Sequence, residues 1–123
     1  MSLRAAVIGV GYLGRFHAQK YKALDNVDLV AVSDVRAENA LNVAKELGVE
    51  AVSDYRQLKG RIDIATIATT TSQHFEVAKW CLENKISVLL EKPMTVESAQ
   101  AEELCRLAEA HQLTLQTGFV ERY

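Results

Sequence analysis

The sequence predicts an α/β domain, built as a doubly wound parallel sheet of six strands in the order 3-2-1-4-5-6. Short apolar runs alternate with longer segments that carry apolar residues at helical spacing, over the whole 123-residue chain. Such alternation is typical of parallel strands, because a parallel neighbour is reached only through a crossover, usually a helix. Right-handed crossovers then give this strand order.

The first half of the chain carries three of these strands. Residues 5–8 are an apolar run without alternation, which suits a strand covered on both faces. The next segment has Phe16 and His17 on its apolar side, and Gly48 is placed to end the second helix as a left-handed cap. In this half we expect strands at residues 4–9, 27–34 and 51–53, helices at 12–24 and 37–47, and a short turn or helix at 54–58.

The second half carries the other three strands and two helices. The fourth strand is rich in β-branched residues, and Ser72 after it can cap a helix. Asn84 can take the left-handed turn that follows this helix, and Thr95 can cap the last helix. We expect strands at 62–68, 86–90 and 113–117, and helices from Ser72 to about Glu83 and from Thr95 to about His111.

The glycine-rich turn after the first strand is the main functional signal. Residues 9–14 read Gly-Val-Gly-Tyr-Leu-Gly, a G-x-G-x-x-G pattern. In such a turn the first glycine allows the tight bend, the second lets a pyrophosphate approach the backbone, and the third lets the helix pack closely. The preceding strand, the amphipathic segment after it, and Asp34 at the end of the second strand favour an NAD(P)-binding Rossmann fold over an ordinary glycine turn. The expected cofactor-binding residues here are Gly9, Gly11, Tyr12, Leu13 and Gly14.

Four more polar residues lie where strands two and four end. Asp34 can accept both adenosine-ribose hydroxyls and would repel a 2′-phosphate, so it favours NAD over NADP; its alternative role is a helix cap. Arg36 can stack on the adenine or remain an exposed helix arginine. Thr69 and Thr70 lie at the crevice where doubly wound sheets bind ligands, or act as caps.

Composition narrows the class of protein. The chain is 49% hydrophobic and 24% charged with a net charge of -2, so no basic face predicts nucleic acid as a partner. No apolar run approaches the roughly 20 residues of a membrane span, which favours a cytoplasmic enzyme. Cys81 and Cys105 are isolated and are expected to be reduced core residues. No cluster has metal-ligand spacing, and a homo-oligomer is possible.

Three motifs resemble one known family. They are Val-Ile-Gly-Val-Gly-Tyr-Leu-Gly at residues 7–14, Ala68-Thr69 with His74 after the fourth strand, and Glu91-Lys92-Pro93 after the fifth. Together they resemble the glucose-fructose oxidoreductase and inositol dehydrogenase family (Gfo/Idh/MocA), over the whole chain. The resemblance implies an NAD(P)-dependent dehydrogenase acting on a sugar or cyclitol alcohol. It also implies that residues 1–123 are its dinucleotide-binding domain and that the family's substrate domain is absent from this chain.

Two segments qualify this resemblance. The family often has proline and asparagine where this chain has Thr70 and Thr71, so the cofactor-facing loop is expected to differ in shape. Residues 118–123, Gly-Phe-Val-Glu-Arg-Tyr, are similar to the Gly-His-x-Glu-Arg-Phe stretch of some nucleotide-sugar 3-dehydrogenases, with Phe119 in place of the histidine. That similarity favours a nucleotide sugar as substrate.

The resemblance assigns roles to three further residues. Lys92 is the expected catalytic residue, because an ammonium at the end of the fifth strand can hydrogen-bond the reacting hydroxyl and manage its proton. Its alternative is a solvated lysine. Glu91 and Lys92 would lie near the nicotinamide ribose, and His74 would reach the cofactor crevice, although a surface or capping histidine is the simpler reading from the sequence.

Two functions of different class therefore compete. The first is a dehydrogenase half that orients a carbinol for hydride transfer to NAD. The second is a non-catalytic NAD-binding regulatory or interaction module, which would keep the glycine turn but have no need of Lys92. A methyl-donor-binding domain is disfavoured, since it would leave Glu91-Lys92-Pro93 unexplained. We expect the isolated chain to bind NAD and to turn over nothing.

Overall fold

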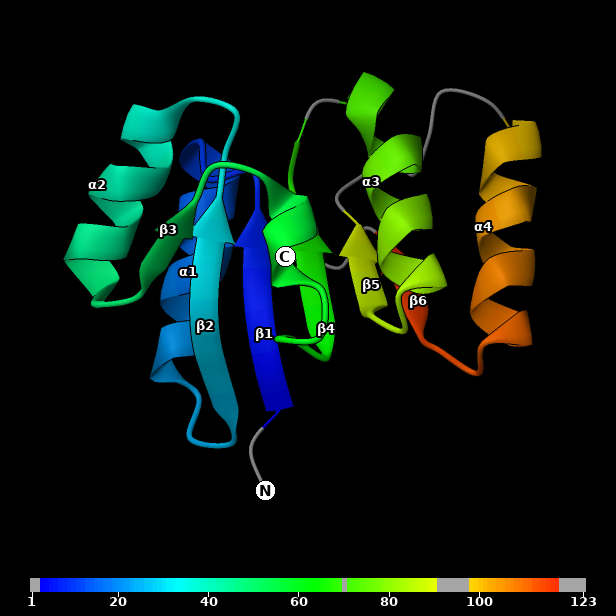
Figure 1. The fold of residues 1–123 in the computed structure, drawn as a ribbon, viewed down its shortest axis with the longest axis horizontal. Coiled ribbons are helices and arrows are strands. Elements are labelled where there is room, and N and C mark those ends of the chain that lie inside the picture. The colour runs from blue at the N-terminus through cyan, green and yellow to red at the C-terminus, as the bar shows by residue number, and fades with distance from the viewer. Residues whose placement is uncertain (1–2, 70, 91–97, 118–123) are drawn as a thin grey trace.

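The structure, a computed structural model, describes residues 3–69, 71–90 and 98–117. Its strands are β1 (Leu3–Ile8), β2 (Val27–Ser33), β3 (Glu50–Val52), β4 (Ile64–Ile67), β5 (Ser87–Leu90) and β6 (Leu115–Thr117). All pair in parallel, and the order β3-β2-β1-β4-β5 is the predicted one (Figure 1). At the β5 edge the short β6 adds three residues, fewer than expected for that segment.

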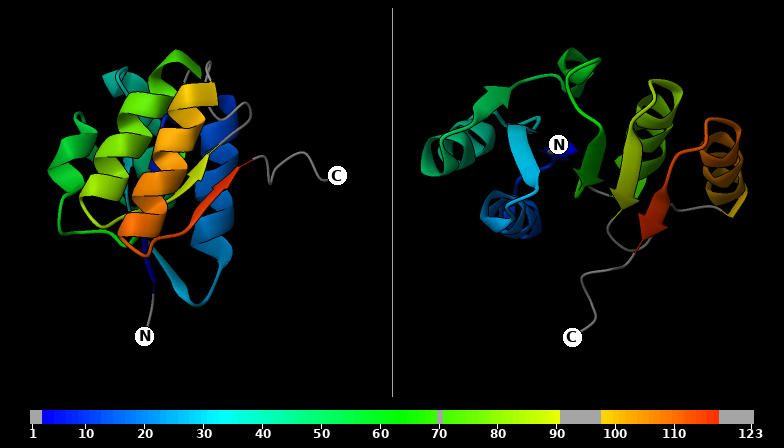
Figure 2. Two further views of the ribbon diagram at one scale, coloured as in Figure 1. Left: turned by 90° about the vertical axis from the view of Figure 1, so that its right-hand side faces the viewer. Right: turned by 90° about the horizontal axis from the view of Figure 1, so that it is seen from below.

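Helices cover both faces of the sheet. They are α1 (Tyr12–Ala23), α2 (Ala37–Leu47), the short 3-10 helix η1 (Tyr55–Leu58), α3 (Thr71–Glu83) and α4 (Ser98–Ala110). α1 and α2 pack on one face with Val7 and Val32, whereas α3 and α4 pack on the other with Ile8 and Ile67. Figure 2, in its view from below, shows α1 on the opposite side of the sheet from α3 and α4. This double cover explains why residues 5–8 are at most 3% exposed, as their unbroken apolar run predicts.

Helix ends confirm one expectation and correct two. Gly48 ends α2 with φ of 70°, the predicted left-handed cap. α3 begins at Thr71, so Ser72 lies inside the helix and not at the expected cap position before it. The left-handed residue after α3 is Lys85, with φ of 66°, and not Asn84. Asn84 instead donates its side-chain amide to the carbonyl of Trp80 at 2.8 Å, and the same carbonyl accepts the Asn84 backbone N–H at 3.1 Å.

Two side chains expected on apolar helix faces lie outside. Phe16 is 44% exposed, because α1 turns His17 and Ala18 toward the sheet. Cys105 is exposed, because α4 packs through Leu104 and residues one turn further along. Cys81, by contrast, is fully buried as expected, and burial raises the pKa of its thiol.

Candidate functional site

The turn between β1 and α1 is formed by glycines that pack backbone against backbone. Gly9 has φ of +94°, and a Cβ there would lie 2.8 Å from the backbone of Ala68 and Thr69 at the end of β4. A Cβ on Gly14 would lie 1.7 Å from the carbonyl oxygen of Gly9. Only glycine fits at these two positions, so the N-terminus of α1 lies directly over the carboxyl end of the central strands.

The middle glycine has the opposite environment. A Cβ on Gly11 would meet nothing within 4 Å, so this residue is not required by the packing of the protein itself. Gly11 is also the N-cap of α1, and none of the described side chains caps this helix. The first N–H groups of α1 have no acceptor inside the helix, because the ladder starts only one turn later. An open approach to uncapped helical N–H groups is suited to an anion.

Asp34 follows β2 directly and bridges two backbone segments. Its Oδ2 accepts the N–H of Val10 at 2.8 Å, and its Oδ1 accepts the N–H of Arg36, the N-cap of α2, at 2.8 Å. A carboxylate has about four lone-pair sites. These two bonds therefore leave acceptor capacity on a half-buried carboxylate next to the glycine turn.

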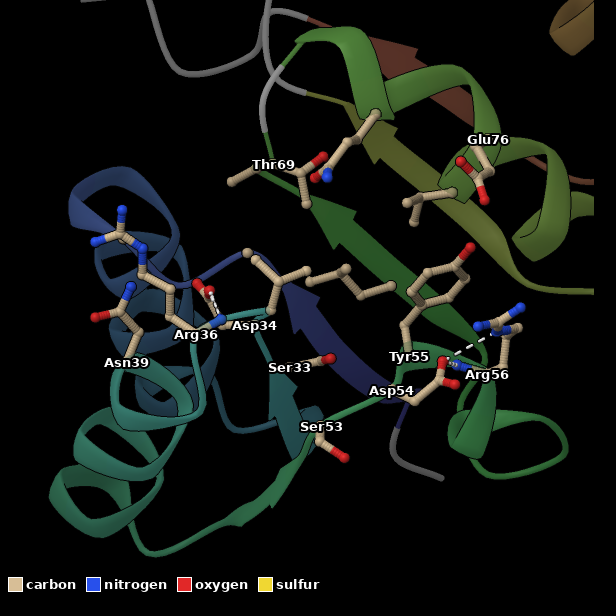
Figure 3. Close-up of a pocket in the computed structure, with 17 residues that line it drawn as sticks. Ser33, Asp34, Arg36, Asn39, Ser53, Asp54, Tyr55, Arg56, Thr69 and Glu76 are labelled. Atoms are coloured by element: carbon tan, nitrogen blue, oxygen red, sulfur yellow. Dashed lines mark hydrogen bonds and ion pairs between the residues drawn. The ribbon is translucent and has the colours of Figure 1, made fainter.

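A pocket of about 470 Å³ opens at this edge of the sheet, beside Gly9, Gly11 and Asp34. Figure 3 shows Asp34 and Arg36 on one side of it and Asp54, Tyr55 and Arg56 on the other. Its polar and charged lining residues are Ser33, Asp34, Arg36, Asn39, Ser53, Asp54, Tyr55, Arg56, Thr69, Gln73 and Glu76. The carboxyl ends of β1, β2 and β4 thus converge on one cavity, as expected where a doubly wound sheet changes direction.

The residues on the far side of the pocket, Asp54, Tyr55 and Arg56, were not predicted from the sequence as site residues. Asp54 caps η1 and accepts the Arg56 N–H at 2.9 Å and the Arg56 Nε at 3.0 Å. The side-chain hydrogen bond from Arg56, followed by the backbone one, holds the pKa of Asp54 below its usual value. One signal could have found this side: Asp54 follows the third strand as Asp34 follows the second, and both are followed by an arginine two residues on.

His74 lies behind the pocket and does not line it. It is 1% exposed, in the first turn of α3, with its Nε2 3.0 Å from the carbonyl oxygen of Thr69. A carbonyl only accepts, so Nε2–H is the donor. His74 therefore supports the Thr69 loop from inside, whereas Thr69 itself faces the pocket.

Some of the expected site residues lie outside the part of the chain that the structure describes. Thr70, Glu91 and Lys92 lie outside the described residues, and so does the 118–123 segment. Tyr12 and Leu13 form the first turn of α1, where their backbone follows Gly11. Within residues 3–69, 71–90 and 98–117, no group of three potential ligands could hold a metal ion. Over the same residues, no helix is both long and apolar enough to cross a membrane.

Known proteins share this arrangement. The family profile described as "Oxidoreductase family, NAD-binding Rossmann fold" (GFO_IDH_MocA) matches residues 3–119. The chain belongs to the Gfo/Idh/MocA family. Within this family, it is 41% identical over 120 residues to UDP-N-acetylglucosamine 3-dehydrogenase of Acidithiobacillus ferrooxidans, a match covering 98% of this chain and 38% of that protein. It is 32% identical over 124 residues to myo-inositol 2-dehydrogenase of Thermotoga maritima, covering 98% and 37%.

Solved structures of Gfo/Idh/MocA-like proteins have the same fold. A structure of the Acidithiobacillus ferrooxidans UDP-N-acetylglucosamine 3-dehydrogenase superposes with a TM-score of 0.93 at 40% identity, over 99% of this chain and 40% of that one. GenD2 from gentamicin A biosynthesis, solved in complex with NAD, superposes with a TM-score of 0.92 at 25% identity, over 95% and 34%. The chain therefore spans about 40% or less of the length of these relatives.

Proposed function

We propose that this chain binds NAD in the pocket at the carboxyl ends of β1, β2 and β4, as the dinucleotide-binding part of a dehydrogenase. The observation that carries this proposal is the environment of Gly11: an open glycine at an uncapped helix N-terminus, next to the Asp34 carboxylate. An anion and a pair of hydroxyls are the chemical groups that fit these donors and acceptors side by side. The pyrophosphate and adenosine ribose of NAD carry them in adjacent positions.

Individual residues then have distinct roles. Gly11 and the N–H groups of Tyr12, Leu13 and Gly14 would receive the pyrophosphate, while the free lone pairs of Asp34 would accept ribose hydroxyls. Arg36, an exposed residue that lines the pocket, would cover the adenine. Thr69 and Thr70 would contact the cofactor at the end of β4, and His74 would act through Thr69, since it does not line the pocket.

We further propose NAD as the preferred cofactor over NADP. A 2′-phosphate would meet the Asp34 carboxylate and would also remove one hydroxyl donor. We expect calorimetry in one buffer to give NAD the tighter binding, by on the order of 1 to 3 kcal/mol. Equal affinities would overturn the role of Asp34. Arg36→Ala should be measured alongside, because the Arg36 guanidinium lines the pocket and could pair with a 2′-phosphate, which would raise the affinity for NADP.

The proposed reaction is hydride transfer from a sugar, cyclitol or nucleotide-sugar alcohol. NAD, when bound, supplies the hydride acceptor. The Glu91-Lys92-Pro93 motif supports Lys92 as the residue that hydrogen-bonds the reacting hydroxyl and, as the neutral amine, takes up its proton to become an ammonium, with Glu91 near the nicotinamide ribose. The match to a UDP-N-acetylglucosamine 3-dehydrogenase and the 118–123 segment support a nucleotide sugar within this class.

Lys92→Ala tests the chemical role. In a full-length dehydrogenase containing this domain, we expect kcat to fall by about 100-fold or more while NAD affinity stays within a few-fold. Lys45→Ala, which removes an exposed lysine of α2 that does not line the pocket, is the control. Survival of kcat within a few-fold would make Lys92 a solvated lysine. For residues 1–123 alone we expect NAD binding without turnover of sugars, cyclitols or nucleotide sugars.

A further inference from the structure

The glycine turn is held by the end of β2 through two consecutive N–H groups. The Gly9 N–H donates to the Ser33 carbonyl at 2.7 Å, and the Val10 N–H donates to the Asp34 carboxylate at 2.8 Å. The first is a backbone bond that continues the pairing of β1 with β2. The second uses a side chain in the place of a carbonyl, so the turn stays attached to β2 one residue beyond the sheet.

This second bond is shielded from water. Val10 is 3% exposed, so its N–H has little access to water if the carboxylate is removed. A buried N–H that loses its acceptor is costly, which favours a rearranged turn. Gly9, at φ of +94° in this turn, is a residue type with unusual backbone freedom, so the bonds around it fix its conformation.

Asp54, a carboxylate on the other side of the pocket, serves as a comparison for the bond between Asp34 and Val10. Asp54 makes the same local bond as Asp34, accepting the N–H of the arginine two residues on at 2.9 Å. It also accepts the Arg56 Nε–H and forms a capping box with Gln57, so these bonds stay within its own segment. Asp34 instead reaches 24 residues back to Val10. The long-range bond therefore belongs to Asp34 and does not follow from an aspartate at a strand end.

We infer that Asp34 is a positioning residue for the glycine turn, holding Val10 so that Gly11 and the first N–H groups of α1 face the pyrophosphate. This deepens the proposed NAD site, on which its functional consequence rests. The Asp34 carboxylate would accept the adenosine-ribose hydroxyls with its free lone pairs. It fixes the phosphate-binding turn with the lone pair that accepts the Val10 N–H. Loss of Asp34 then weakens binding at the pyrophosphate as well as at the ribose.

The structural half of this inference is tested without cofactor. Asp34→Ser keeps a hydroxyl that can accept the Arg36 N–H but is too short to reach Val10. By NMR hydrogen exchange we expect the Val10 amide to exchange at least about tenfold faster in Asp34→Ser. Asp54→Ser, the same change across the pocket, should leave Val10 exchange unchanged. Equal Val10 exchange in wild type and Asp34→Ser would overturn the inference.

A second measurement needs no variant. Scalar coupling between the Val10 amide nitrogen and the Asp34 carboxylate carbon, transmitted through the hydrogen bond, is expected in the wild-type chain. This keeps the test decisive if Asp34→Ser fails to fold. Absence of the coupling, with couplings visible across the β1–β2 backbone bonds of the same sample, would overturn the inference.

The functional half uses NAD and its analogue lacking both adenosine-ribose hydroxyls. If Asp34 only reads the ribose, wild type and Asp34→Ser bind the analogue equally. If it positions the turn, Asp34→Ser still binds the analogue about tenfold more weakly. A wild-type chain that binds neither ligand would refute the proposed function alone, because Val10 exchange and coupling report on the turn in the free protein.

Discussion

Two Asp-x-Arg segments face each other across the pocket, residues 34–36 after β2 and residues 54–56 after β3 (Figure 3). In both, the aspartate accepts the N–H of the arginine two residues on. They differ in what else the aspartate binds. Asp34 binds the glycine turn, whereas Asp54 binds the guanidinium of its own Arg56.

The position of each strand in the sheet explains this difference. β2 pairs with the central strand β1, so the residue after β2 emerges beside the turn that follows β1. β3 is an edge strand, and Asp54, two residues beyond its end, makes its side-chain bonds within residues 54–57. The same Asp-x-Arg motif therefore gives the pocket two different sides. Residues 34–36 form a connected side, bonded to the glycine turn, and residues 54–56 form a self-contained side, bonded within their own segment. Substitutions on the two sides should differ accordingly.

The largest contrast is expected between two glycine-to-alanine changes. Gly14→Ala places Cβ 1.7 Å from the Gly9 carbonyl oxygen, so backbone must move, and we expect a loss of about 3 kcal/mol in the free energy of unfolding. Gly60→Ala, beyond η1, meets no atom within 4 Å, and its cost is the left-handed conformation at φ of +77°, about 1 to 2 kcal/mol. Urea unfolding of both variants measures the difference. Equal losses would show that the glycine turn is no more constrained than the self-contained side.

A smaller effect, on binding alone, is expected at the open glycine. Gly11→Ala meets no protein atom, so its free energy of unfolding should stay within about 0.5 kcal/mol of wild type. The added methyl group occupies the approach to the N–H groups of α1, and NAD affinity should fall about tenfold, or about 1.4 kcal/mol. Calorimetry and urea unfolding on one sample give both numbers. Unchanged NAD affinity would remove Gly11 from the site.

The sequence was sufficient where a local pattern decides the outcome. Apolar runs and helical spacing located the strands and helices, and Gly48 was correctly placed as a cap because glycine has a strong preference for the left-handed region. The difference between Asn84 and Lys85 was missed, since the local bond that the Asn84 side chain makes to the Trp80 carbonyl one helical turn earlier was not weighed.

Tertiary neighbours decide the rest. The Gly9 and Gly14 contacts agree with the packing expected of G-x-G-x-x-G, but their distances depend on how β4 lies beside β1. His74 was expected in the crevice, and its burial behind Thr69 depends on the path of the loop that precedes α3. Residues 54–56 were not predicted to line the pocket. They lie beside it because β3 is next to β2 in the sheet, and their own sequence motif does not indicate this.

The smallest expected effect is a pH dependence on the self-contained side. Hydrogen bonds from the Arg56 side chain and then its backbone N–H lower the pKa of Asp54 from the ordinary 3.8. Because the folded-state pKa lies below the unfolded one, the stabilisation is present above the unfolded pKa and is lost as the pH falls through the folded pKa. In Arg56→Gln the backbone N–H remains, so the pKa of Asp54 should rise only part of the way.

Wild type and Arg56→Gln should therefore differ slightly in unfolding free energy at neutral pH and converge in acid. The Arg56 and Asp54 side chains are 62% and 43% exposed, which keeps the difference small and sensitive to salt. An NMR titration of the Asp54 carboxylate carbon, with urea unfolding at several pH values, measures both quantities. The Arg56 guanidinium also lies 5.7 Å from the centroid of the Tyr55 ring. A difference in unfolding free energy that persists below the folded pKa of Asp54 would mean that Arg56 stabilises the protein through this packing and not through the Asp54 carboxylate.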